Sequence, residues 1–202
     1  MRDTVVPEYV DMGLSVKWAN YNLGASTPAG VGDYYAWGET EPKTEYTWAN
    51  YKWSNGSTIA LTKYCTVDTM GNDGFTDGLT TLLPEDDAVQ VHKGGNWRMP
   101  SSEEWEELRK NCTWTQTELN GQTGFIAQSK INGNSIFIPV TGFRSGKNLV
   151  LEYIGGYWSS SLNTGRQSCA FGMYLNLNEN RVGKYSNSNR QDGFLIRPVL
   201  SE

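Results

Sequence analysis

The stretch that decides the fold is Gly156-Tyr157-Trp158-Ser159-Ser160-Ser161, followed by an alternating run over residues 169–177 and closed by Gly193-Phe194-Leu195-Ile196-Arg197-Pro198-Val199. In the middle run, apolar residues occupy the odd positions, and small or polar residues occupy the even ones. A period of two is typical of a strand with one buried and one solvated face. We therefore expect the odd positions to point into the core: Cys169, Phe171, Met173, Leu175 and Leu177.

The even positions of this run and the loops beside it are rich in Asn, Ser, Tyr and Arg. Tyr and Arg offer large contact areas and Ser and Asn offer adaptable hydrogen bonds, the mixture that antibody loops use. The alternative is a plain solvated sheet face, which is usually richer in Lys and Glu. The composition favours a ligand-binding surface made of Asn163, Arg166, Gln167, Ser168, Tyr174, Asn176, Asn178, Arg181, Tyr185, Asn187, Asn189 and Arg190.

Two helices are predicted before this stretch. Pro84 and three following acidic residues indicate a helix start, and Gly94-Gly95 would end that helix. After Pro100, Ser101 and Glu104 form a capping-box pattern. The face of this second helix that we expect to be buried carries Trp105, Leu108 and Cys112.

Short strands are predicted on both sides of the helices. Residues 14–19 alternate, residues 32–38 are aromatic between glycines, and residues 125–131 and 135–140 flank an Asn132-Gly133 hairpin turn. Residues 39–82 are polar with scattered Tyr and Trp, so we expect an irregular segment that is held by its rings. No linker interrupts the chain. We predict an N-terminal extension over residues 1–8 and a single α+β domain over residues 9–202, loop-rich, with a twisted and mainly antiparallel sheet.

The bulk composition restricts the partners. A net charge of −5 argues against general binding to nucleic acid or anionic lipid. No apolar run is long enough for a membrane span, and residues 1–7 lack the apolar core of a signal peptide.

Residues for catalysis or metal binding are sparse. His92 is the only histidine and no Gly-x-Ser-x-Gly elbow occurs, so we expect no enzyme activity. Residues 68–77 have the composition of a calcium loop but lack EF-hand spacing, so we favour an Asx-rich turn. We expect no cofactor, and calcium binding at this segment stays an open alternative. The three cysteines, Cys65, Cys112 and Cys169, form no CxxC pair, which argues against a zinc site. A single disulfide between two of them is an open alternative.

Six short motifs in a fixed order resemble the "major paralogous domain" (FISUMP) modules of surface-associated proteins from Bacteroidetes. The resemblance covers residues 9–200 and implies a C-type-lectin-like fold of the formylglycine-generating-enzyme type, at the cell surface, outside the cell or carried by a phage. The motifs are residues 10–19, Gly32-Asp33-Tyr34-Tyr35-Ala36-Trp37-Gly38-Glu39-Thr40, Pro84-Glu85-Asp86-Asp87-Ala88, Trp97-Arg98-Met99-Pro100, Gly156-Tyr157-Trp158-Ser159-Ser160-Ser161 and Arg197-Pro198-Val199.

That fold class includes the variable proteins of diversity-generating retroelements, in which a reverse transcriptase rewrites adenines in a segment that contacts ligand. Residues 162–190 resemble such a segment, which implies a variable surface that binds a protein or glycan at a cell surface. Gln167, Met173, Glu179 and Lys184 depart from the adenine pattern. Formylglycine generation needs a late cysteine pair, and only Cys169 lies late, so that activity is not carried over. A structural or adhesive domain without a dedicated ligand remains an alternative, and a formylglycine-type enzyme is a weaker one.

Overall fold

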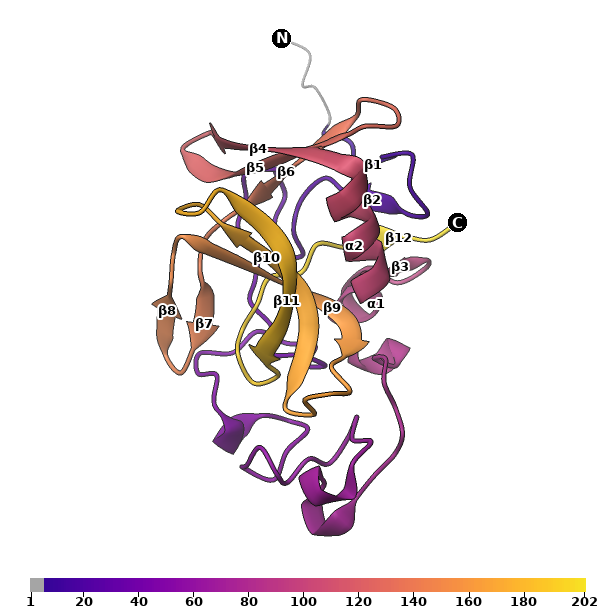
Figure 1. The fold of residues 1–202 in the computed structure, drawn as a ribbon, viewed down its shortest axis with the longest axis vertical. Helices are drawn as coiled ribbons and strands as arrows, with labels where there is room; N and C mark the ends of the chain where they lie inside the picture. Colours follow the sequence, from indigo (N-terminus) through magenta and orange to yellow (C-terminus); the bar gives the residue numbers. More distant parts are fainter. Residues whose placement is uncertain (1–5) are drawn as a thin grey trace.

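A computed structural model describes residues 6–202. In these residues the chain forms two α-helices and short, mostly antiparallel sheets, which confirms the mixed α and β class (Figure 1). The helices are α1 (Ala88–Lys93) and α2 (Ser102–Asn111). The strands are β1 (Tyr9–Val10), β2 (Lys17–Ala19), β3 (Trp97–Arg98), β4 (Cys112–Leu119), β5 (Gln122–Ser129), β6 (Ser135–Pro139), β7 (Phe143–Ser145), β8 (Asn148–Val150), β9 (Ile154–Leu162), β10 (Cys169–Asn176), β11 (Arg181–Asn189) and β12 (Val199–Leu200).

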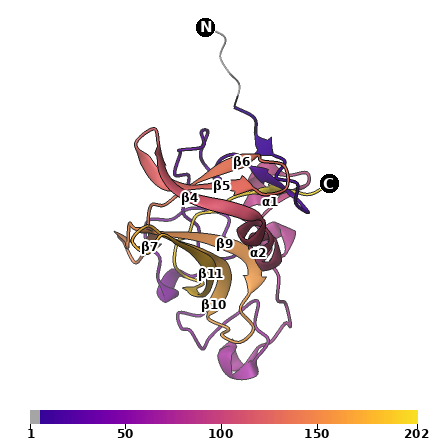
Figure 2. The same cartoon turned by 45° about the horizontal axis from the view of Figure 1, so that its top comes forward.

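The strands form four groups. Their orders are β1-β2-β12-β3, β4-β5-β6, β11-β10-β9 and the hairpin β7-β8, and neighbouring strands in each run antiparallel. Figures 1 and 2 show β4–β6 at one end of the molecule and residues 39–82 at the other, with β9–β11 and α2 between them. Both ends of the described chain meet in the first sheet, because β1 and β12 each pair with β2. The predicted extension over residues 1–8 lies mostly outside the described residues.

The sheet β9–β11 separates two clusters of buried side chains. Tyr157, Met173 and Leu175 pack with Trp105 of α2 in one cluster. Trp158, the next residue of β9, packs with Phe194 and others in the second cluster. Successive side chains of a strand point to opposite faces, so this sheet contributes to both clusters and is held from both sides.

The second helix follows the prediction closely. The Ser101 side chain accepts a hydrogen bond from the Glu104 backbone N–H (3.2 Å), and the Glu104 carboxylate accepts one from the Ser101 N–H (2.8 Å). Trp105 and Leu108 are buried, as expected. Cys112 is also buried, but it begins β4 instead of ending the helix.

The first helix is shorter than predicted, because the acidic residues expected in its first turn lie before it and make other contacts. Asp87 is the N-cap and accepts hydrogen bonds from the N–H groups of Val89 (2.8 Å) and Gln90 (3.3 Å). Asp86 is buried at the end of a 3₁₀ turn, where it pairs with Lys63 (2.6 Å) instead of facing a helix dipole.

Two other predictions differ from the structure. Residues 32–38 form no strand, and only an isolated bridge joins Tyr35 to Phe194. Strand β4 was not predicted, although the turn that joins it to β5 carries the Asn-Gly signal of a tight hairpin. Asn120 and Gly121 both have positive φ, 50° and 81°.

The polar segment 39–82 is irregular, with short 3₁₀ turns at Trp48–Asn50, Asp68–Met70 and Asn72–Gly74. Its rings hold it to the body, as expected from the sequence. Tyr51 is buried and donates to the Trp37 carbonyl (2.7 Å), and Trp53 donates to the Gly38 carbonyl (2.7 Å). The segment is therefore fixed by specific side-chain to backbone hydrogen bonds.

Candidate ligand-binding surface

The twelve predicted ligand residues lie on the hairpin β10–β11 and the loops at its two ends, which we call the ribbon. The register pairs Cys169 with Asn189 at one end and Asn176 with Arg181 at the other. At about 3.3 Å per residue these two ends lie roughly 20 Å apart. The candidates are therefore spread along one surface and do not converge in a single pocket.

A pair of tyrosines occupies the middle of the ribbon. Tyr174 and Tyr185 are half-buried, and their ring centroids are 5.2 Å apart. Tyr185 stacks on Phe194 (5.6 Å, 9° between planes), which stacks in turn on the buried Trp158 (4.4 Å, 18°). The Trp158 indole N–H donates to the Tyr35 carbonyl (2.7 Å). This row of rings runs from the core to the surface and fixes the outer pair in place.

Glycines make the row of rings possible. A Cβ at Gly156 would lie 2.8 Å from the Phe194 ring. Gly172 instead allows β10 to approach β9, since a Cβ there would lie 2.2 Å from the Tyr157 carbonyl oxygen. A glycine inside a strand often marks such a close approach. The glycine before Tyr157 is therefore a sequence signal for the stack.

Burial also favours the protonated form of the Tyr185 hydroxyl. Loss of solvent raises the pKa of Tyr185, and the nearby Tyr174, Asp192 and Cys169 raise it further. Asp192 is itself buried, and desolvation raises the pKa of its carboxyl group. The surface therefore presents a hydroxyl donor on a rigid ring.

The exposed candidates lie at the two ends of the ribbon. Arg166 and Asn187 are exposed and are 3.4 Å apart (Nη1 to Oδ1), while the Asn163 amide donates to the Ser186 carbonyl (2.6 Å). At the hairpin tip Arg181 lies 3.7 Å from Glu179, and the Arg181 side chain is 67% exposed. The remaining candidates, Asn178 and Asn189, are exposed and half-buried respectively.

Four of the twelve candidates are buried, and for them the prediction of ligand contact is wrong. They are Gln167, Ser168, Asn176 and Arg190. The Gln167 amide exchanges two hydrogen bonds with Thr66 (2.9 and 2.8 Å). The Asn176 side-chain oxygen Oδ1 accepts from the N–H groups of Asn178 (2.9 Å) and Glu179 (3.1 Å), so it shapes the hairpin turn.

Arg190 is the clearest correction, because its side chain is fully buried. Its guanidinium donates to the Tyr51 hydroxyl (3.0 Å) and to the carbonyls of Lys63 (2.9 Å), Tyr64 (3.1 Å) and Gln167 (3.2 Å). These bonds join the irregular segment to the end of the ribbon. Polarity alone could not separate such an anchor from a surface arginine.

The predicted alternation also fails at one position. A register shift between Ala170 and Gly172 interrupts the pairing of β10 with both neighbours. Ala170 is consequently buried and Phe171 is half-buried, with the Lys184 ammonium 3.8 Å from the centre of its ring. Beyond this bulge Met173 and Leu175 point into the core as predicted.

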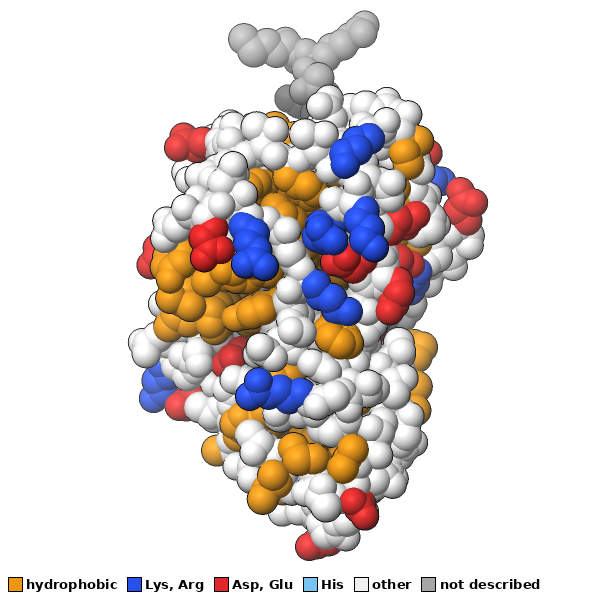
Figure 3. All heavy atoms as spheres, in the orientation of Figure 1, with side chains coloured by type: hydrophobic (Ala, Val, Ile, Leu, Met, Phe, Trp, Pro, Cys, Tyr) orange, Lys and Arg blue, Asp and Glu red, His pale blue; other side chains and the backbone are white. Residues whose placement is uncertain are grey.

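Hydrophobic side chains also reach the surface beside the ribbon. Figure 3 shows them gathered where the hairpin β7–β8 lies next to β10 and β11. The exposed residues of this region include Leu151 and Tyr153 (42% and 39% exposed). Contiguous exposed apolar area is typical of an interaction site.

The metal and membrane predictions concern other parts of the chain. The Asp77 carboxylate accepts hydrogen bonds from the backbone N–H groups of Tyr64 (2.7 Å), Cys65 (3.0 Å) and Leu79 (3.0 Å), so it forms a local turn and joins it to residues 64 and 65. Within residues 6–202 no group of three or more His, Cys, Asp or Glu side chains could hold a metal ion. The same residues contain no helix that is long and apolar enough to cross a membrane.

The three cysteines are free and buried. His92 lies in the last turn of α1, with its Nε2 atom 2.7 Å from the Thr40 carbonyl oxygen.

No family model, no curated protein and no solved structure matches this chain.

Proposed function

We propose that this chain is a ligand-binding module that contacts a protein or glycan through the ribbon, at a cell surface or outside the cell. One observation carries the proposal: Tyr174 and Tyr185 stand at the surface on a row of stacked rings rooted in the core. Rigid aromatic side chains lose little entropy on binding and are common binding hot spots. Exposed Arg and Asn side chains at both ends of the ribbon would surround this centre with polar contacts.

The scaffold in this proposal is a C-type-lectin-like fold of the major paralogous domain type. Its support is the resemblance of six sequence motifs in order, together with a mixed α and β chain that has two helices. The proposed diversity-generating segment is narrower than residues 162–190, since Arg190 is an anchor. Among the twelve candidates, the positions free to vary are the exposed ones: Arg166, Asn178, Arg181 and Asn187.

A binding role agrees better with the cysteines than an enzymatic role. Burial raises the pKa of the Cys169 thiol, so the reactive thiolate is disfavoured. Cys65 and Cys112 are buried as well and form no disulfide with it. We therefore propose no catalytic function.

Binding is tested with a panel of glycans and extracellular protein domains, probed with labelled protein. The double variant Tyr174→Ala, Arg181→Ala should lose the signal, whereas Lys130→Ala, on an exposed turn after β5, should retain it. Both variants should stay folded by circular dichroism. Equal signals from the double variant and the wild type would refute the assigned surface.

The gene locus tests the diversification separately. A nearby reverse transcriptase and a second, near-identical copy of the codons for residues 162–199 are expected. The copy should encode glycine at position 172, where no Cβ fits, and adenine-rich codons at Asn178 and Asn187. A locus without the second copy would exclude programmed diversity and leave the binding test unaffected.

A further inference from the structure

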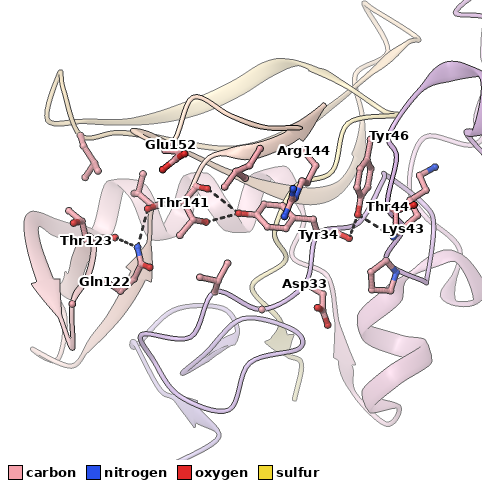
Figure 4. Close-up of a pocket in the computed structure, with 17 residues that line it drawn as sticks. Asp33, Tyr34, Lys43, Thr44, Tyr46, Gln122, Thr123, Thr141, Arg144 and Glu152 are labelled. Carbon is pink, nitrogen blue, oxygen red and sulfur yellow. Dashed lines mark hydrogen bonds between the residues drawn. The ribbon is translucent and has the colours of Figure 1, made fainter. Parts of the chain in front are cut away.

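A groove of about 860 Å³ lies apart from the ribbon and shares only Leu177 with residues 162–190. It runs between residues 31–34, the loop 42–46, the start of β5 and the hairpin β7–β8 (Figure 4). Its volume is in the range of sites that hold small organic ligands. The proposed ribbon surface makes no use of it.

The groove contains a cation without a partner. The Arg144 guanidinium lies 5.5 Å from the centre of the Tyr34 ring, and its nitrogens make no hydrogen bond or ion pair within residues 6–202. By contrast Lys43, the other cation of the groove, is bound to Glu39 (2.9 Å) and to the Asn50 carbonyl (3.2 Å). A half-buried guanidinium with its donors free is suited to a carboxylate, which it can bind with two parallel hydrogen bonds.

Tyr34 and the backbone of Arg144 are held in place before any ligand arrives. The Tyr34 hydroxyl bonds to the Thr141 side chain (2.9 Å), and the Tyr34 carbonyl accepts from the Tyr46 hydroxyl (2.6 Å). The Arg144 backbone exchanges two hydrogen bonds with Gly193, both 2.8 Å. A preorganised site loses less free energy in ordering when it binds.

The rest of the lining restricts the kind of anion. Asp33 and Glu152 are exposed and lie on different sides of Arg144, as Figure 4 shows, and neither forms an ion pair within the described chain. Two carboxylates disfavour a phosphate or a polyanion, but they accept hydrogen bonds from hydroxyl groups. The Gln122 amide donates to the Thr123 and Val140 carbonyls (2.9 and 3.1 Å), which directs its oxygen away from them as a further acceptor.

We propose that this groove binds an acidic sugar, with the carboxylate of one sugar unit on Arg144. The hydroxyls of this and neighbouring units donate to Asp33, Glu152 and Gln122, and threonine hydroxyls along the groove complete the contacts. One unpaired cation among several acceptors matches a ligand that has one carboxylate and many hydroxyls. This site is independent of the ribbon and of the proposed function.

The test is calorimetric titration of the full chain with a disaccharide of one glucuronic acid and one neutral sugar, and with its methyl ester as the uncharged match. The acid form should bind at least tenfold more tightly than the ester. Arg144→Gln should weaken binding of the acid form at least tenfold, while Lys147→Gln, an exposed cation on the same hairpin, should change it less than twofold. Thermal unfolding checks that both variants are folded, and Tyr174→Ala should bind like the wild type.

Several results would overturn the proposal. These are absence of binding at millimolar acid sugar, equal affinity for acid and ester, and equal effects of Arg144→Gln and Lys147→Gln. Equal or tighter binding of inorganic phosphate would show a general anion site, and equal or tighter binding of a capped peptide with one glutamate would show a peptide site. Either result would also reject the sugar.

Discussion

Replacement of Arg190 by Ala should destabilise the protein severely without touching an exposed surface. The guanidinium makes four hydrogen bonds of 2.9–3.2 Å, three of them to backbone carbonyls, and it is fully buried. At a net value of about 1 kcal/mol for each bond, the loss is about 4 kcal/mol. Contacts with Trp37 and Tyr51, whose ring centres lie 5.0 and 5.4 Å from the guanidinium carbon, are lost as well.

The assay is urea unfolding followed by tryptophan fluorescence, with Arg181→Ala as the matched control at the other end of β11. Arg181 is exposed, so its replacement should change the free energy of unfolding by less than about 0.5 kcal/mol. In a chain of this length, 4 kcal/mol corresponds to a fall in Tm of roughly 8–16 °C. If Arg190→Ala unfolds within about 1 kcal/mol of the wild type, or if both variants are equally unstable, the argument that Arg190 is an anchor is refuted.

Three further predictions concern single positions. Gly172→Ala should cost about 3 kcal/mol in chemical denaturation, because its Cβ would lie 2.2 Å from the Tyr157 carbonyl oxygen; wild-type stability would show that the strands can separate there. Ser101→Ala should cost about 1 kcal/mol by removing the α2 cap, measured by thermal unfolding, and an unchanged Tm would contradict this. Burial raises the pKa of Asp192 in the folded state, so its contribution to stability is complete below about pH 4 and is lost as pH rises through the folded pKa. Unfolding measured from pH 3 to 7 should therefore decline less for Asp192→Asn than for the wild type; equal declines would exclude this role.

The local features of the fold were predictable where short-range chemistry decides them. The capping box at Ser101 and Glu104 and the hairpin at Asn132-Gly133 depend on residues close in sequence, and both occur in the structure. The strand predicted over residues 32–38 was wrong, because the conformation there depends on the distant Phe194. That residue pairs with the run through a single isolated bridge at Tyr35. Period-two alternation predicted the inward side of β10 beyond residue 172 but not the bulge before it.

The site was predictable as a region but not residue by residue. The sequence placed the candidates on one late hairpin, and Tyr174, Tyr185 and Arg181 do reach its surface. It could not distinguish Arg190 from Arg181, because both are polar residues in a polar stretch. Only the tertiary structure shows that one of them meets the carbonyls of a segment more than a hundred residues away.

The reactivity of the three buried thiols can be used to measure local unfolding of the protein. Cys65 lies in the irregular segment, Cys112 at the junction of α2 and β4, and Cys169 at the start of β10. Burial raises the pKa of Cys112 to about 11 and also raises that of Cys169, so a thiol reagent reaches reactive sulfur only when the surrounding structure unfolds transiently. The modification rate at each cysteine would rank three regions of the molecule by their opening free energy, with no label introduced.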